Sequence, residues 1–178
     1  MNGPILSIIT VNFNNNLGLL KTLESVSSQS FSSYEHIIID AGSTDGSRET
    51  IIQYEKENPH LSFWSSEPDK GIYDGMNKGI DHAKGQYLYF LNSGDCLSQD
   101  ILAKIPFDGT EYLYGDTILF YKRKTKKRVY PDTLDLIYLS DFHYTINHVL
   151  YIIPYLKIKD MTLITKSYLI GHIVSSAL

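Results

Sequence analysis

Short apolar runs alternate with longer polar segments along the first hundred residues. Each run is rich in β-branched or aromatic residues and has the length of a strand that is buried in a parallel sheet. The runs are Leu6–Asn12, 34–40, 61–65 and 87–91. Periodicity of about 3.6 residues fills the gaps between them, which predicts a helix after each of the first three strands.

The expected helices follow from spacing and from start and stop signals. Leu17, Leu20, Leu23 and Val26 recur at helical spacing, and segment 43–47 supplies capping residues ahead of a second helix. A third helix is predicted over 73–83. The order β-α-β-α-β-α-β predicts an α/β domain with a mostly parallel central sheet flanked by helices.

The amino-acid composition narrows the class of protein to which this chain can belong. The 178 residues suffice for one domain, the net charge is −4, and 43% of residues are hydrophobic. This charge favours no general binding of nucleic acid. Cys96 is the single cysteine, which fits a reducing, cytoplasmic compartment. We see neither a signal peptide nor an 18-residue apolar span in the sequence, so no transmembrane helix is expected.

One basic run departs from the acidic average. Residues 122–128, KRKTKKR, are predicted to form the turn between two strands at 111–121 and 127–130. A solvated hairpin tip and a contact with phosphates or membrane headgroups both remain open for this run.

Two acids follow the second strand. Asp40 at its end can accept hydrogen bonds from a ribose hydroxyl or a base N–H, because ligands bind at the carboxyl ends of strands in open α/β sheets. Alternatively, Asp40 caps the next turn, and Asp45 lies near a helix N-terminus, where a negative charge is stabilising.

Further polar groups follow the third and fourth strands. Asp74 and Asn77 share one face of the third predicted helix, which is either a solvated face or a sugar and phosphate contact. Asn92 and Asp95 follow the strand YLYFL; this loop is either a surface turn or a site for Mg²⁺ or Mn²⁺.

Taken together, these segments resemble the family 2 glycosyltransferases of the GT-A nucleotide-diphospho-sugar transferase fold. The resemblance covers about residues 5–148 and is closest to bacterial enzymes of surface polysaccharide synthesis. It is carried by SIITVNFNN, IIIDAGSTDGS, EPDKGIYDGMNKGI and YLYFLNSGD. No G-x-G-x-x-G follows the first strand, which argues against a Rossmann oxidoreductase.

The resemblance implies a role for each matching residue. Asp40 hydrogen-bonds the base, and Asp95 holds Mn²⁺ or Mg²⁺ against the donor diphosphate. The donor-binding residues that it implies are Thr10, Val11, Asn12, Asp40, Lys70, Asp74, Asn77 and Asn92. The implied donor is a UDP-sugar, and the implied acceptor is a saccharide or lipid-linked saccharide. Contact with the inner face of a membrane and a homo-oligomer are further expectations.

The end of the chain departs from the family pattern. Past residue 148 the family continues towards an acidic general base in a Ser-Asp-Trp segment, which 149–178 lacks, so the catalytic base is unknown. Read one nucleotide earlier with free codon choice, residues from Lys157 onward can spell NKGYDTNYKVISDW. A frame change near His148 is one hypothesis, and a genuine divergent tail is the other. A non-catalytic nucleotide-binding or interaction domain is therefore the alternative function.

Overall fold

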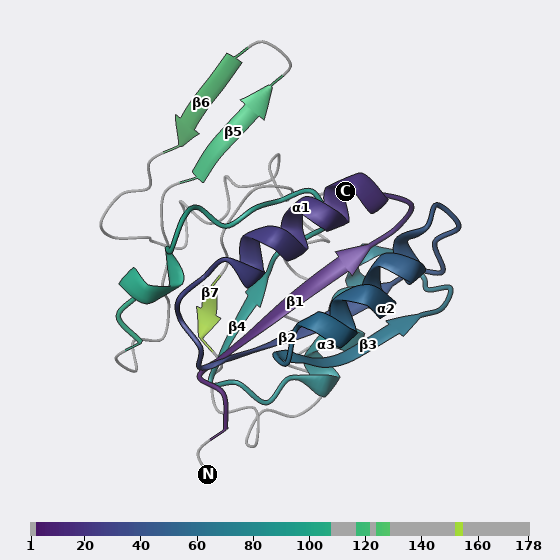
Figure 1. Ribbon diagram of the computed structural model, residues 1–178, viewed down its shortest axis with the longest axis horizontal. Coiled ribbons are helices and arrows are strands. Elements are labelled where there is room, and N and C mark those ends of the chain that lie inside the picture. Colours follow the sequence, from purple (N-terminus) through teal and green to yellow (C-terminus); the bar gives the residue numbers. More distant parts are fainter. Residues whose placement is uncertain (1–2, 108–116, 122–123, 129–151, 155–178) are drawn as a thin grey trace.

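The chain folds around a twisted five-stranded sheet (Figure 1). The computed structural model describes residues 3–107, 117–121, 124–128 and 152–154. The strand order is β3-β2-β1-β4-β7. The strands are β1 (Leu6–Asn12), β2 (Tyr34–Asp40), β3 (Leu61–Ser66), β4 (Tyr87–Phe90) and β7 (Ile152–Pro154).

The central strands β1 and β2 pair in parallel, and all of their residues are buried. Strands β3 and β4 join them in parallel on either side. Asn12 lies opposite Asp40 in the register, so the polar ends of β1 and β2 are adjacent. The predicted parallel α/β architecture is confirmed.

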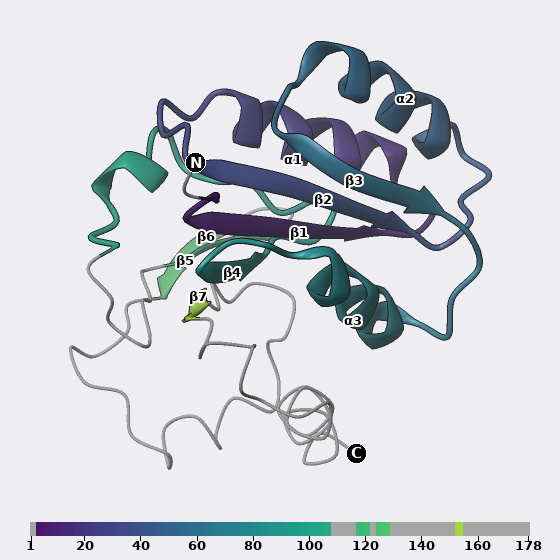
Figure 2. The ribbon, with the colours of Figure 1, turned by 90° about the horizontal axis from the view of Figure 1, so that it is seen from below.

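Helices cover both faces of the sheet, as Figure 2 shows. Helices α1 (Asn16–Ser27) and α2 (Ser47–Glu57) lie on one face, and α3 (Ile72–His82) lies on the other. The predicted helix 73–83 is therefore correct within one residue at each end.

The buried face of α1 differs from the prediction. Leu17 and Leu20 are 77% and 48% exposed, whereas Leu19, Leu23 and Val26 are buried. Two overlapping apolar stripes run along this helix, and the stripe that contains Leu19 is the one that packs on the sheet.

A short antiparallel strand extends the sheet beyond β4. The residues 152–154 form β7 and pair with β4. They are the described part of the segment 149–178, which the sequence marked as a divergent tail. The other predictions for that segment lie outside the described residues.

Residues 124–128 of the basic run form a strand. Strands β5 (Thr117–Tyr121) and β6 (Lys124–Arg128) pair antiparallel in a separate two-stranded sheet. The sequence placed the second strand at 127–130 and treated the basic residues as the turn. Backbone pairing with β5 explains why this charged segment is extended.

A polar network crosses the core between β1, β2 and α2. His36 has no exposed surface; its two ring nitrogens lie 2.9 Å from Thr10 Oγ1 and 3.0 Å from Tyr54 Oη. Burial lowers the pKa of His36 to about 3, so the ring is neutral. On the neighbouring strand β3, Trp64 packs against the cluster formed by Leu19, Leu23, Ile38, Ile51 and Tyr54.

Candidate functional site

A cleft of about 910 Å³ opens at the carboxyl ends of β1, β2 and β4. Its lining comes from the loops after these strands and from the start of α3. The lining residues are Val11, Asn12, Phe13, Ala41, Gly42, Pro68, Asp69, Gly71, Ile72, Asn92, Ser93, Gly94 and Asp95. This is the edge at which the sequence predicted a ligand site.

Asp40 lies beneath this cleft and is completely buried. Its Oδ1 accepts hydrogen bonds from Asn12 Nδ2 at 2.7 Å and from Ser43 Oγ at 2.5 Å. Its Oδ2 accepts from the Ser43 backbone N–H at 2.9 Å and from Ser66 Oγ at 2.6 Å. Asp40 thereby joins the ends of three strands.

These contacts determine the charge of Asp40. Burial raises the pKa of its carboxyl, but the hydrogen bonds from Ser43, Ser66 and Asn12 together lower it below the ordinary value. A carboxylate has about four lone-pair positions, and four donors already occupy them. A direct hydrogen bond from Asp40 to a base stays a prediction, and it requires one of these donors to move.

Two amide oxygens at the cleft lack a donor. Asn12 and Asn92 both line the cleft, and the Oδ1 atom of each is buried with no hydrogen-bond partner. The Asp40 carboxylate accepts only, so it fixes the Asn12 amide with its N–H group towards Asp40. Buried acceptors without donors are rare in folded proteins, which points to a ligand with donor groups or to a cation.

The loops after β1 and β2 brace each other. Asn14 donates its backbone N–H to Ser43 Oγ at 2.8 Å, and its side-chain oxygen accepts from the Thr44 N–H at 2.9 Å. Asp45 accepts from the backbone N–H of Asn16 at 2.7 Å and from Ser47 Oγ at 2.6 Å. Asp45 thus connects the first turns of α1 and α2, and it does not line the cleft.

Helix α1 positions the loop that carries Asp95. Thr22 Oγ1 donates to the Asp95 carbonyl at 2.8 Å and accepts from the Gly94 N–H at 2.9 Å. Asn15 Nδ2 donates to the Ser93 carbonyl at 2.9 Å. Gly94 has a φ of 101°, which an L-residue rarely adopts, so glycine is required at this turn.

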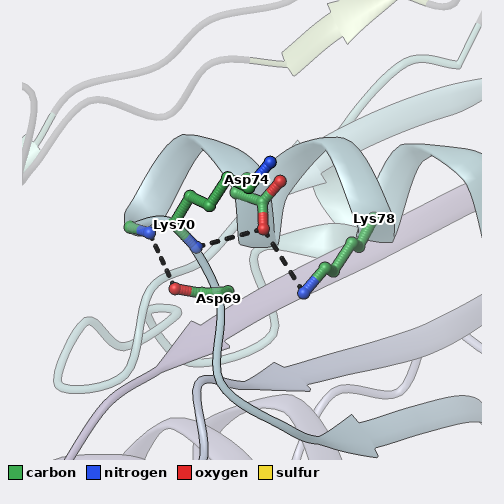
Figure 3. Close-up of polar contacts among 5 residues, drawn as sticks. Asp69, Lys70, Asp74 and Lys78 are labelled. Carbon is green, nitrogen blue, oxygen red and sulfur yellow. Dashed lines mark hydrogen bonds and ion pairs between the residues drawn. The ribbon is translucent and has the colours of Figure 1, made fainter.

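The start of α3 forms another wall of the cleft. Figure 3 shows the polar contacts in this segment. Asp69 lines the cleft and accepts from the Gly71 N–H at 2.8 Å. Asp74 accepts from the Lys70 backbone N–H at 3.2 Å and pairs with Lys78 at 3.3 Å. The Lys70 N–H and then Lys78 lower the pKa of Asp74.

The predicted residues divide into two groups. Val11, Asn12, Asn92 and Asp95 line the cleft together, whereas Thr10, Asp40, Lys70, Asp74 and Asn77 do not. Thr10 is completely buried and contacts His36 instead. Lys70 belongs to the loop before α3, and Asp74 and Asn77 belong to α3 itself.

Sequence reasoning assigned no individual role to three contributors. Phe13 lines the cleft and is 64% exposed, which makes it a flat platform for a ring. Its position directly after a buried strand was the signal. For Asp69, the nearby turn at Gly71 was the feature of the sequence that could have indicated a site residue. For Thr22 the sequence offers no such feature, because its contact with Gly94 spans 72 residues.

The donor set at the cleft bears on metal binding. Among the residues described here, no group of three or more His, Cys, Asp or Glu side chains could hold a metal ion. Asp95 and the oxygen of Asn92 are nevertheless hard oxygen donors at one cleft, which suit Mg²⁺ or Mn²⁺. The set fits a cation that completes its coordination with ligand phosphates.

Solved structures define the class as the GT-A fold. A mannosyltransferase from Pyrobaculum calidifontis, in complex with GDP-Man and Mn²⁺, matches with a TM-score of 0.52 and 21% identity. That match covers 57% of this chain and 31% of the mannosyltransferase. TarS 1-349 of S. aureus, in complex with UDP, matches with a TM-score of 0.51 and 22% identity, covering 56% of this chain and 30% of TarS.

The chain belongs to glycosyl transferase family 2, whose sequence model matches residues 7–172. An uncharacterized glycosyltransferase of Mycobacterium tuberculosis is 43% identical over 103 residues, or 57% of this chain and 38% of the relative. The putative teichuronic acid biosynthesis glycosyltransferase TuaG of Bacillus subtilis is 37% identical over a match that covers 57% of this chain and 40% of TuaG. A PGL/p-HBAD biosynthesis glycosyltransferase of Mycobacterium bovis is 30% identical over a match that covers 67% of this chain and 49% of that relative. The chain therefore spans less than half the length of these relatives.

None of the helices in the described ranges combines the length and the apolar character that crossing a membrane requires.

Proposed function

We propose that the cleft binds a UDP-sugar and that the protein transfers the sugar to an acceptor hydroxyl in surface polysaccharide synthesis. The observation that carries this proposal is the pair of donorless amide oxygens of Asn12 and Asn92 in a cleft that also contains Asp95. A nucleoside offers base N–H and ribose O–H donors, and its diphosphate attracts a cation. The family and the teichuronic acid relative support the same class of reaction.

Each part of the cleft has a proposed role in donor binding. The exposed ring of Phe13 offers a stacking surface for the base. The buried Asn12 oxygen accepts from the nucleoside after the side chain has shifted towards the cleft. Asp40 holds Asn12 in place, or contacts the base after Ser43 or Ser66 has moved. On the opposite wall, the polar start of α3 faces the sugar diphosphate with Lys70, Asp74 and Asn77.

Asp95 and Asn92 would hold Mn²⁺ or Mg²⁺ together with the donor phosphates. When bound, the cation supplies positive charge that stabilises the departing diphosphate. Thr22 contributes by fixing the backbone on either side of the Gly94–Asp95 peptide.

The proposed reaction is a direct displacement with inversion. The acceptor oxygen forms a bond to the anomeric carbon, the bond from that carbon to the diphosphate breaks, and a base takes the hydroxyl proton. A positioned base contributes about 10²–10⁴-fold to such a step. The expected place of that base, past residue 148, lies outside the described residues, apart from β7. If the frame-change hypothesis holds, the chain binds the donor but transfers sugar slowly; the nucleotide sequence of the gene tests this.

Calorimetry of UDP binding tests the donor site. UDP affinity is expected to rise with Mn²⁺ and to fall on Asp95→Ala. Asp81→Ala, at an exposed acid of α3, removes the same charge away from the cleft and should leave both values unchanged. Equal UDP affinity with and without Mn²⁺ would remove the metal role from Asp95.

Isotope-labelled UDP-sugars with simple saccharide acceptors test the activity. Transfer or slow donor hydrolysis identifies an enzyme. UDP binding without either product supports the alternative, a non-catalytic nucleotide-binding domain.

A further inference from the structure

The densest cluster of basic residues in this chain lies at the β5–β6 hairpin. β6 has the sequence KTKKR, and the basic run 122–128 to which it belongs holds six of the 16 Lys and Arg residues of the chain. The rest of the chain carries ten basic and 20 acidic residues, a formal charge of −10. Residues 3–107, which carry seven basic and 13 acidic residues, are therefore an acidic body, and the hairpin is a basic arm.

The hairpin projects from the body (Figure 1) and belongs to its own two-stranded sheet. An isolated two-stranded hairpin is marginally stable in water, so a surface that covers it would stabilise it. Thr125, Lys126 and Lys127 of β6 are exposed, and Ile118, opposite Lys127 in the register, is 51% exposed. The arm thus offers positive charge together with an exposed apolar side chain.

We propose that the β5–β6 hairpin docks this protein on an anionic lipid bilayer. A planar anionic surface attracts a projecting basic arm, while repulsion of the acidic body falls off over about 8–10 Å in physiological salt. Ile118 favours a bilayer over free phosphate, because the boundary with the acyl chains accepts an apolar side chain. A nucleic acid fits less well, since its extended phosphate backbone would approach the acidic body.

Vesicle co-sedimentation of the full chain tests the proposal. The unmodified protein should bind vesicles of phosphatidylcholine containing phosphatidylglycerol, bind neutral phosphatidylcholine vesicles weakly, and be released by salt. Each basic residue near an anionic surface raises partitioning about fivefold, so Lys126→Gln with Lys127→Gln should lower it about 25-fold. Both positions are exposed on an edge of the hairpin, and circular dichroism checks that the double variant folds.

The matched control removes the same charge elsewhere. Lys56→Gln with Lys104→Gln neutralises two exposed lysines, on α2 and at the 3₁₀ turn Leu102–Lys104, and should leave vesicle binding unchanged. Ile118→Ser should weaken vesicle binding without changing its salt dependence. The proposal is overturned if neutral vesicles bind equally well, if both double variants lose the same affinity, or if the chain binds RNA but not anionic vesicles. The assay contains no nucleotide, so its outcome is independent of the proposed transferase activity.

Discussion

Replacing Asp40 by Asn should destabilise the protein, although the two side chains have nearly the same shape. In the native structure four donors surround the Asp40 carboxylate, and the residue has no exposed surface. An asparagine has one carbonyl oxygen and presents an NH₂ group to two of these donors. At the Oδ1 position the NH₂ group would face Asn12 and the Ser43 hydroxyl, and both can adapt, because an amide can turn over and a hydroxyl also accepts. The Ser43 backbone N–H can only donate, so the carbonyl oxygen of the new side chain must take the Oδ2 position.

The magnitude follows from the loss of the charge. A hydrogen bond to a charged group contributes about 1.5–3 kcal/mol and one to a neutral group about 0.5–1.5 kcal/mol; all four bonds lose the charged acceptor, and the two at Oδ1 must also reverse their direction. We therefore expect Asp40→Asn to lower the free energy of unfolding by about 2–5 kcal/mol. The hydrogen bonds hold the pKa of Asp40 below its ordinary value of 3.8. The stabilisation is therefore complete above pH 3.8 and is lost as the pH falls through the lowered value.

Urea denaturation at pH 7 measures this loss, with Asp45→Asn as the matched control. Asp45 also accepts several hydrogen bonds, but it is exposed, so water can replace them and a much smaller loss is expected. Calorimetry of UDP on the same two variants separates stability from base recognition. An unchanged free energy of unfolding for Asp40→Asn would refute the structural role assigned to the four bonds.

Three further predictions concern single side chains. Burial lowers the pKa of His36 from 6.5 to about 3, so unfolding should become easier as the pH falls below 6.5, by at most about 1.4 kcal/mol per pH unit. In urea melts His36→Gln should flatten this slope, and an equal slope would contradict it. Thr22→Val removes the hydroxyl between Gly94 and Asp95 and should reduce the gain in UDP affinity that Mn²⁺ gives; an unchanged gain in calorimetry would exclude the positioning role. Gly79→Ala should cost about 1–3 kcal/mol in denaturation, because the added Cβ would collide with Ile9; no loss would show that α3 can shift away from β1.

The sequence predicted the core strands well because their signals are local. β1 and β2 have the predicted bounds, since a turn-forming residue, Asn14 or Gly42, stands two residues past the end of each strand. The buried face of α1 was less predictable, because Leu17 and Leu19 are equally apolar and only packing on the sheet decides between their stripes. The strand β6 was not predicted over 124–128, because a run of charged residues is not typical of a strand and its extended structure depends on pairing with β5.

The sequence predicted the edge of the sheet at which the candidate site lies, but not the hydrogen bonds within that site. The order of strands and acids indicated where the cleft would lie, and Asn12, Asn92 and Asp95 are all there. The four donors to Asp40 were not predictable, because Ser66 comes from a strand 26 residues further along the chain. Such long-range contacts turn a candidate ligand residue into one that also supports the cleft from below.

The position of Trp64 makes the edge of the sheet observable by fluorescence. Trp64 is the single tryptophan, and on β3 it packs against the core cluster that contains Leu19 and Ile38. Its emission should therefore report whether β3 and α2 stay attached to the sheet. Trp64 is not part of the cleft lining, so UDP should not contact it directly. If calorimetry records heat on adding UDP while the Trp64 emission stays constant, the donor binds without loosening this edge of the sheet.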